Sequence, residues 1–414
     1  MLTRRTVITQ SLKAGTAIAL ASVTDFSFAQ QATPASPPDE MTANSAPQGQ
    51  KTPALSDPPP AVLPSEAEAV RGRHSLQAHA QKHGLIAGAA VVVQDLLLDP
   101  ALQKLVTAQY GILVSERELK WRALRPSKDE FDFTQSDALF AFANSRRMKV
   151  RGHTMVWHNS VPDWLSNGAG QLDVSQLLID HIRTVAGRYR GRVHSWDVVN
   201  EAIMPADGQK DNLRNSFWLQ HIGPDYIELA FRAAREADPI ARLTYNDYAV
   251  EYDNPEESGR RESILALLRR MQQHNVPLDA VGIQAHIKAG ARDSIGKGLS
   301  QYIESLRQMG LEVYITELDV NEDDLPFNDV ARRDHIIART YSEFLAVALA
   351  NPAVKLMLTW GVSDRRTWLN EVPTHHRKQP SRPQRSLPFD RNYRPKEAFF
   401  AIRDAVDARP FASV

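Results

Sequence analysis

Two glutamates follow strand-like apolar runs, and as a pair they have the chemistry needed to cleave a glycosidic bond. Glu201 closes the segment 195–201, and Glu317 lies within 314–319. Placing a carboxylate against buried residues is costly, so each has either a charged partner or a chemical task. One such glutamate alone could be a salt bridge at the rim of a fold. Two among tryptophans and amides favour glycoside hydrolysis, in which one carboxyl protonates the leaving oxygen and the other attacks the anomeric carbon or activates water.

The elements that must carry these glutamates alternate along the chain. Runs rich in β-branched residues predict strands at 86–93, 110–114, 149–157, 193–199, 242–248, 281–287, 312–318 and 354–360. Amphipathic segments predict helices between them at 176–188, 226–237, 262–274, 299–309 and 336–350. Eight strand-like runs that alternate with helical segments predict an α/β fold, and they favour a closed (β/α)8 TIM barrel over an open sheet. No glycine-rich dinucleotide fingerprint follows the first run, which weakens a Rossmann-type interpretation.

Polar and aromatic side chains stand at the carboxyl ends of these runs, where barrel enzymes build their active sites. They are Glu116, His153, Trp157, Asn200, Asn246, Asp247, Gln284, His286, Asp319, Trp360 and Asp364. A barrel would bring them into one ring around a central opening. The sequence therefore predicts a cleft lined by carboxylates, amides and aromatic rings.

Several motifs, in the right order, resemble the xylanases of glycoside hydrolase family 10. The resemblance covers about residues 70–405. Its motifs are 151–158 (RGHTMVWH), 196–202 (WDVVNEA), 245–248 (YNDY), 282–286 (GIQAH), 315–319 (ITELD), 359–364 (TWGVSD), 387–390 (LPFD) and 393–396 (YRPK). The resemblance implies a single (β/α)8 catalytic domain. It also implies a retaining, endo-acting enzyme that hydrolyses the β-1,4 bonds of xylan and uses no cofactor.

The resemblance further implies roles for the two glutamates and their neighbours. Glu317 would be the nucleophile, and Glu201 would be the acid that protonates the departing oxygen and then acts as a base. This double role requires a raised pKa for the acid while its neighbour is charged. His286 would hydrogen-bond the nucleophile and, with Asp319, hold its orientation and charge. Asn200 would bond the 2-hydroxyl of the sugar at the cleavage site.

Other side chains are implied to bind the sugar. Trp157 and Trp360 would form apolar walls around the sugar next to the cut, and Trp368 would cover the loop side, although tryptophan also packs in protein cores. The residues implied to form hydrogen bonds with ring hydroxyls are Glu116, Lys120, His153 and Gln284.

Two positions depart from the family's pattern, and both belong to one sugar subsite. Arg117 stands where the family usually has asparagine, and Ser160 stands where it usually has glutamine. Arginine adds a long cation that cannot accept a hydrogen bond. We therefore expect the chemistry to be retained, and a substituted or acidic β-linked glycan to be cleaved better than plain xylan. Two alternatives stay open: a glycosidase of this fold that acts on another β-linked glycan, and a catalytically silent glycan-binding barrel.

The amino-acid composition limits which kinds of molecule this protein is expected to bind. Forty-nine basic residues balance forty-nine acidic ones, which argues against a nucleic acid. The absence of cysteine excludes disulfides and thiolate metal sites. His153 and His158 lie five residues apart across a strand end, and the chain has no HExxH or His-x-His pattern, so no metal site is expected. The expected partner is a polysaccharide or oligosaccharide, bound by a monomer.

The first 64 residues differ in composition from the rest. Arg4 and Arg5 precede an apolar stretch with a small-residue end near Ala29, so residues 1–29 resemble a twin-arginine signal peptide more than a disordered basic tail. The twin-arginine export machinery is then an expected partner. Residues 30–64 are rich in proline and predict a disordered linker. The catalytic domain is expected at 65–414, in a periplasmic or secreted protein without a stable membrane anchor.

Overall fold

The structure is a computed structural model that describes residues 70–410, and its strands and helices alternate along that part of the chain. The strands are β1 (Ile86–Val91), β2 (Ile112–Ser115), β3 (Lys149–Val156), β4 (Ser195–Asn200), β5 (Arg242–Asp247), β6 (Ala280–Ile283), β7 (His286–Lys288), β8 (Glu312–Asn321) and β9 (Val354–Thr359). The α-helices are α2 (Leu76–Lys82), α3 (Val93–Leu98), α4 (Pro100–Gln109), α5 (Trp121–Leu124), α6 (Thr134–Ser145), α7 (Asp163–Gly168), α8 (Val174–Arg188), α9 (Phe217–Ile222), α10 (Tyr226–Ala237), α11 (Pro255–Gln273), α12 (Lys297–Gln308), α13 (Val330–Ala348) and α14 (Glu397–Asp407).

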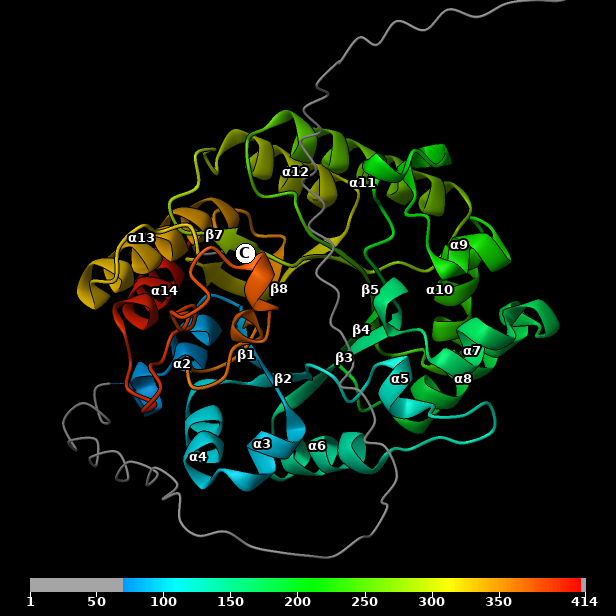
Figure 1. Ribbon diagram of the computed structural model, residues 1–414, viewed down its shortest axis with the longest axis horizontal. Coiled ribbons are helices and arrows are strands. Elements are labelled where there is room, and N and C mark those ends of the chain that lie inside the picture. Colours follow the sequence, from blue (N-terminus) through cyan, green and yellow to red (C-terminus); the bar gives the residue numbers. More distant parts are fainter. Residues whose placement is uncertain (1–69, 411–414) are drawn as a thin grey trace, which may run out of the picture. The chain divides into compact units, whose positions relative to one another are not determined.

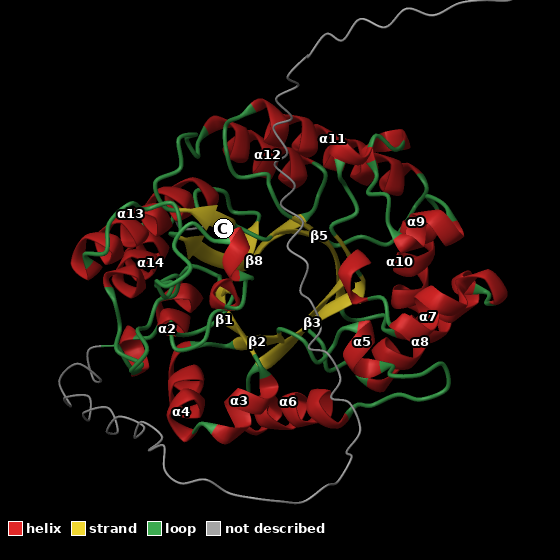
Figure 2. Ribbon diagram, in the orientation of Figure 1, coloured by secondary structure: helices red, strands yellow, loops and turns green. Residues whose placement is uncertain are grey.

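All the described strands except β7 close into a parallel barrel. The strands follow the order β6-β5-β4-β3-β2-β1-β9-β8, and the pairing of β6 with β8 completes the ring. The helices surround this ring, as Figures 1 and 2 show. Each strand is buried on both faces in such a barrel, which explains why the strand segments read as almost continuous apolar runs. The expected (β/α)8 barrel is confirmed.

The sixth predicted strand differs from the structure. The run 281–287 was expected to be continuous, but it is divided into β6 and β7, and β7 pairs with β8 alone among the described strands. Ala285 lies at the break with a φ of 62°, in the left-handed region that a strand does not use. The apolar character of the run does not reveal this break, because alanine is apolar whether its backbone is extended or left-handed.

Two predicted helices begin at least six residues earlier in the structure than their apolar pattern suggests. The helix expected at 262–274 is α11, which begins at Pro255, and the helix expected at 336–350 is α13, which begins at Val330. Asn254 caps α11 by accepting a hydrogen bond from the Glu257 backbone N–H at 2.9 Å. Asp329 caps α13 in the same way. Side-chain caps and polar first turns start a helix before its apolar stripe begins.

The barrel has one apolar core inside the ring of strands and another between the strands and the helices. The inner cluster consists of Ala90, Ile112, Val114, Ala280, Tyr314, Leu356, Leu358 and Trp360. Strand residues of opposite parity, such as Ala89 and Leu113, belong to the outer cluster. The two clusters follow from the two-residue period of a strand. Trp360 joins the inner cluster at the carboxyl end of β9, beside the predicted cleft.

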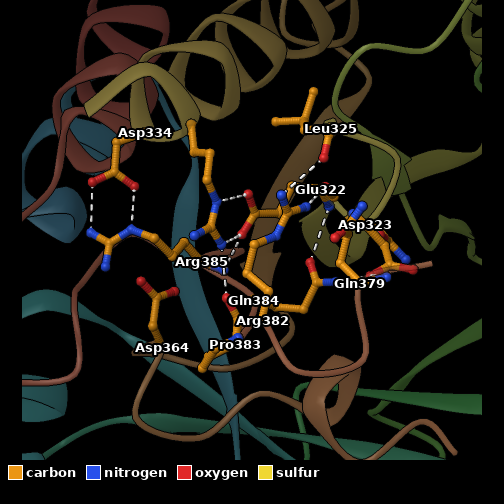
Figure 3. Close-up of polar contacts among 12 residues, drawn as sticks. Glu322, Asp323, Leu325, Asp334, Asp364, Gln379, Arg382, Pro383, Gln384 and Arg385 are labelled. Carbon is orange, nitrogen blue, oxygen red and sulfur yellow. Dashed lines mark hydrogen bonds and ion pairs between the residues drawn. The ribbon is translucent and has the colours of Figure 1, made fainter. Parts of the chain in front are cut away.

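A cluster of ion pairs fastens the long loop between β9 and α14 to the end of β8 and to α13. Arg333 of α13 donates from Nε to Glu322 at 2.6 Å, and Arg385 of the loop donates from Nε to Asp334 at 2.7 Å. Arg382 donates to the backbone oxygen of Glu322 at 2.9 Å (Figure 3). Glu322 and Arg333 are buried, so their charges depend on these partners. The cluster thereby holds a loop that also carries Trp368.

The strand register brings three predicted site residues to the same rim of the barrel. The backbone N–H of Glu201 donates to the carbonyl of Asn246 at 2.9 Å. The N–H of Gln284 donates to the carbonyl of Asp247 at 3.0 Å, and the N–H of Glu317 donates to the carbonyl of Gln284 at 3.0 Å. These bonds link the carboxyl ends of β4, β5, β6 and β8, where barrel active sites lie.

The predicted signal at 1–29 and the predicted linker at 30–64 lie outside the described residues. Among residues 70–410, no helix combines the length and the apolar character that crossing a membrane requires.

Candidate active site

Two asparagines connect the glutamates at the rim. The side-chain nitrogen of Asn246 donates to Glu317 Oε1 at 2.8 Å and to Asn200 Oδ1 at 2.8 Å. Asn200 donates in turn to Glu201 Oε1 at 3.1 Å. A continuous chain of side-chain hydrogen bonds therefore joins the two carboxylates. The sequence predicted that Asn246 lines the cleft but assigned it no role, and the structure shows that it connects the two glutamates.

Glu201 is held from both its backbone and its side chain. Its φ is 60°, a conformation that costs energy for a residue with a side chain and that is common at functional sites. Its backbone oxygen accepts a hydrogen bond from Arg214 Nε at 2.8 Å. Its carboxylate accepts one from Gln284 Nε2 at 3.0 Å and lies 3.7 Å from His158 Nδ1. Arg214 lies in the loop after β4, and no motif in the sequence pointed to it.

The groups around Glu201 outweigh the effect of its burial. Burial raises the pKa of the Glu201 carboxyl, while His158, Arg214 and the hydrogen bond from Gln284 lower it. The lowering effects together are larger, so the pKa lies below its ordinary value. The expectation of a raised pKa for this carboxyl is therefore wrong for this geometry. The physical reason is that donors from separate loops converge on it, and each favours the charged form.

This environment makes a prediction about pH dependence. Gln284→Leu removes a donor that stabilises the Glu201 carboxylate, so the pKa of Glu201 rises. The alkaline limb of kcat/KM, where the acid loses its proton, is then expected to move to higher pH. Hydrolysis rates measured from pH 3 to 9 check this. An unchanged alkaline limb, or one that moves to lower pH, would contradict the prediction.

Glu317 lies against a histidine that is itself held by a second carboxylate. His286 Nε2 is 3.3 Å from Glu317 Oε2, and His286 Nδ1 is 2.9 Å from Asp319 Oδ1. Burial lowers the pKa of His286, but Asp319 and Glu317 raise it well above its ordinary value, so the ring is an imidazolium. Burial raises the pKa of Glu317, but His286, His153 and Lys120 lower it to about 2. Glu317 is therefore a carboxylate at neutral pH.

Trp368 extends this arrangement. It lies in a short 3-10 helix (Trp368–Asn370), and its indole N–H donates to Asp319 Oδ2 at 2.6 Å. The rings of Trp368 and His286 are 5.1 Å apart. The loop after β9 thus reaches the nucleophile candidate through Asp319 and His286. The structure brings His286 and Asp319 to Glu317, where the sequence predicted them, and it adds the contact of Trp368 with Asp319, which the sequence did not predict.

Lys120 lies between two of the predicted aromatic walls. Its Nζ is 4.5 Å from the centre of the Trp157 ring and 6.0 Å from the centre of the Trp360 ring. Burial lowers the pKa of Lys120 to about 8, against the opposing effect of Glu317 and Glu116. Burial raises the pKa of Glu116 to about 7. The charge of this pair therefore changes near neutral pH, close to the two catalytic candidates.

Two residues predicted to bind sugar hydroxyls have other partners in the structure. His153 Nδ1 is 3.0 Å from Asp197 Oδ2, and the His153 side chain is only 2% exposed. Asp197 also binds the guanidinium of Arg151. Gln284 donates to Asn200 Oδ1 at 3.2 Å as well as to Glu201. Both residues therefore hold other parts of the site, which spacing along the sequence could not reveal.

The arginine that departs from the family's pattern forms an ion pair. Arg117 Nη2 is 2.5 Å from Glu371 Oε2, and both side chains are nearly half-exposed. Glu371 also lies 3.3 Å from Arg366, which binds Asp95 at 2.6 Å. The pair joins the loop after β2 to the loop after β9. Ser160, the other departing residue, is buried.

Gly282 leaves the space that the asparagine chain needs, and this makes a second prediction. A Cβ at this position would lie 2.0 Å from Asn246 Oδ1. Gly282→Ala is therefore expected to displace Asn246, to lower kcat by at least about tenfold and to lower the free energy of unfolding by about 1–3 kcal/mol. Steady-state kinetics and urea unfolding measure the two effects.

Gly259→Ala is the matched control for this variant. A Cβ at Gly259, within α11, would meet no described atom within 4 Å. Wild-type kcat and equal or slightly higher stability are expected, because alanine favours a helix. Wild-type kcat in Gly282→Ala would show that the asparagine chain has no part in activity.

No group of three or more His, Cys, Asp or Glu side chains in residues 70–410 is arranged to hold a metal ion.

Comparison with known proteins agrees with this geometry. Residues 75–405 match the model of Glycosyl hydrolase family 10. Endo-1,4-beta-xylanase B of Thermotoga neapolitana is 34% identical over 305 residues, which cover 73% of this chain and 82% of that protein. The crystal structure of native xylanase 10B from Thermotoga maritima superposes with a TM-score of 0.70 at 32% identity, over 80% of this chain and 98% of that one. Xylanase 10B from Thermotoga petrophila RKU-1, solved in complex with xylobiose, gives a TM-score of 0.68 at 32% identity, over 80% and 97%. The chain belongs to glycosyl hydrolase family 10.

Proposed function

We propose that this protein is a retaining endo-1,4-β-xylanase. The observation that carries the proposal is the chain of hydrogen bonds Glu201–Asn200–Asn246–Glu317, which fixes two carboxyl groups relative to each other at the rim of the barrel. The relatives named endo-1,4-beta-xylanase and the solved relative with bound xylobiose support xylan as the substrate. A protein that only bound glycans would have no use for a complete pair of acid and nucleophile.

The first chemical step uses both carboxyl groups at once. The Glu317 carboxylate attacks the anomeric carbon and forms a covalent ester, while the bond from that carbon to the glycosidic oxygen breaks. Glu201 gives its proton to the departing oxygen. His286 as an imidazolium keeps Glu317 ionised before the attack, because its positive charge favours the carboxylate.

The second step reverses these roles. Glu201, now a carboxylate, removes a proton from water, and the resulting oxygen attacks the anomeric carbon as the bond to Glu317 breaks. Two displacements at one carbon retain its configuration. Trp157, Trp360 and Trp368 supply apolar faces for the sugar, while Glu116, Lys120 and Asn200 supply polar atoms around it.

The ion pair of Arg117 bears on the choice of substrate. A uronic acid substituent carries a carboxylate that competes with Glu371 for the exposed guanidinium. The exposed guanidinium supports a preference for glucuronoxylan over unsubstituted xylan, provided that the carboxylate of the substituent displaces Glu371.

Hydrolysis of glucuronoxylan and of unsubstituted xylo-oligosaccharides by the purified protein tests both parts of this proposal. Reducing ends measure the rate, and NMR identifies the anomer that is released first. We expect the β-anomer and faster hydrolysis of glucuronoxylan. First release of the α-anomer would contradict the retaining mechanism, and equal efficiency would contradict the preference. Tight xylan binding without turnover would favour the silent glycan-binding barrel.

We also propose that residues 1–29 direct the protein through the twin-arginine pathway to the periplasm or the medium. The order of Arg4 and Arg5, an apolar stretch and a small-residue end supports this. The double variant Arg4→Lys/Arg5→Lys is expected to stay unprocessed in the cytoplasm, which cell fractionation measures. Normal export of that variant would contradict the proposed pathway.

A further inference from the structure

A buried glutamate behind the site contacts neither catalytic candidate. Glu251 lies in the loop after β5, and the residue is 3% exposed. Its Oε1 accepts a hydrogen bond from the backbone N–H of Ala285 at 3.0 Å, and its Oε2 accepts one from the N–H of Val250 at 2.8 Å. Burying a carboxylate costs free energy. The use of one oxygen of this carboxylate to accept a hydrogen bond from the Ala285 N–H, far away in the sequence, indicates that the position of this peptide matters.

Ala285 is flanked by the two residues that contact the catalytic candidates. It lies between Gln284 and His286, at the break between β6 and β7, with a φ of 62°. Its carbonyl accepts hydrogen bonds from the N–H of Ile287 at 3.0 Å and from the N–H of Asp319 at 3.3 Å. The Glu251 carboxylate thus completes the hydrogen bonding of a residue whose conformation a strand ladder cannot hold.

The neighbours of Ala285 reach the two catalytic candidates in opposite directions. Gln284 donates to Glu201 Oε1 at 3.0 Å, and the His286 ring lies 3.3 Å from Glu317 Oε2. Rotation or displacement of the peptide at Ala285 would therefore disturb both contacts together. Burial raises the pKa of Glu251 above its ordinary value, although the backbone N–H groups of Val250 and Ala285 and the charge of His286 oppose this effect.

We infer that Glu251 is a positioning residue for hydrolysis, because it fixes the backbone of Ala285 and through it the aim of Gln284 at Glu201 and of His286 at Glu317. The inference deepens the proposed function and rests on it. Glu251 does not touch the sugar in this role. Its loss should therefore lower kcat and leave the binding of substrate nearly unchanged.

Glu251→Gln in the full-length protein is the first test. The amide places a donor toward one of the two backbone N–H groups, so one of these bonds is lost. We expect kcat to fall by about 10- to 100-fold, as for a small misplacement of catalytic groups, with KM within about twofold. Both limbs of the kcat/KM profile should move to higher pH, because weakened donors raise the pKa values of Glu201 and Glu317.

Glu257→Gln is the matched control. Glu257 lies at the start of α11, and its carboxylate also accepts a backbone hydrogen bond, from Tyr252 at 2.6 Å. Burial and the charge of Glu251 raise the pKa of Glu257 to about 8, so glutamine resembles its protonated form. We expect wild-type kcat and an unchanged pH profile. Equal kinetic changes in the two variants would overturn the inference, since a general effect on this loop would then explain them.

Glu251→Asp decides the question if the glutamine variant does not fold. Aspartate keeps the charge but ends one methylene short of the Ala285 N–H. The inference predicts a similar loss of kcat, and full activity in this variant would overturn it.

A spectroscopic readout separates this inference from the proposed substrate. The imidazole nitrogen shifts of His286, identified by their loss in His286→Gln, should change in Glu251→Gln and stay constant in Glu257→Gln. This result would support positioning even if the wild type hydrolysed a glycan other than xylan. Unchanged His286 shifts in Glu251→Gln would overturn the inference whatever the substrate.

Discussion

Glu317→Ala is expected to abolish hydrolysis of glucuronoxylan, with kcat lower by on the order of 10⁴-fold or more. The carboxylate that forms the covalent intermediate is removed, and its neighbours cannot replace it. Asp319 is already bound by His286 at 2.9 Å and by Trp368 at 2.6 Å. Glu201 must supply the proton in the same step. Release of reducing ends by the purified variant measures the loss.

Glu312→Ala is the control on the same strand. Glu312 stands at the amino end of β8, where it accepts a hydrogen bond from the Tyr314 hydroxyl at 2.6 Å. Activity within about threefold of wild type is expected, because the amino-terminal face of a barrel serves stability rather than catalysis. Azide should restore activity to Glu317→Ala and give an α-glycosyl azide, since the anion attacks where the carboxylate stood. More than a hundredth of wild-type activity without azide would show that Glu317 is not the nucleophile.

Glu201→Ala is expected to affect substrates according to their leaving group. On xylan, loss of the general acid should lower kcat by about 10²–10⁴-fold. On an aryl β-xylobioside with an acidic phenol, the first step needs little help from an acid and should remain fast. The second step still lacks its base, so the covalent intermediate should accumulate. Stopped-flow measurement should then show a burst of phenol followed by slow turnover.

The product with azide distinguishes the two glutamates. Azide should speed the slow phase of Glu201→Ala and give a β-glycosyl azide, because it replaces water in the second displacement. An equal loss of rate on both substrates, with no burst, would contradict the assignment of Glu201 as acid and base. His158→Ala is a useful control, because His158 lies 3.7 Å from Glu201 but supplies neither the proton of the first step nor the base of the second. It should keep the leaving-group dependence of the wild type.

Much of the site could be predicted because barrel strands are buried on both faces. Each buried strand appears in the sequence as an apolar run, and a polar residue at the end of such a run marks the rim of the barrel. Glu201 and Glu317 were found in this way, and the motifs around them identified the family. The same rule placed Asn246 at the rim, but it did not reveal that Asn246 connects the two glutamates.

The residues that tune the site could not be predicted in this way. Arg214, in the loop after β4, donates a hydrogen bond to the backbone oxygen of Glu201. Glu251, in the loop after β5, accepts one from the backbone N–H of Ala285 at the break between β6 and β7. The loops that carry Arg214 and Glu251 have no periodic pattern of apolar residues, so the local sequence does not indicate which groups these side chains contact. The lowered pKa of Glu201 follows from the same fact, because it is set by groups that only the folded loops bring together.

The sequence by itself therefore determined the barrel, the two carboxylates and the family, since these depend on short apolar runs and on residues adjacent to them. Tertiary structure alone decided the partners: His153 binds Asp197, Gln284 binds Glu201, and Arg117 pairs with Glu371, which is 254 residues away along the chain. The physical reason is that a side chain's role depends on the donors, acceptors and charges within a few ångströms of it. Those neighbours come from loops that follow different strands, and only closure of the barrel places them side by side.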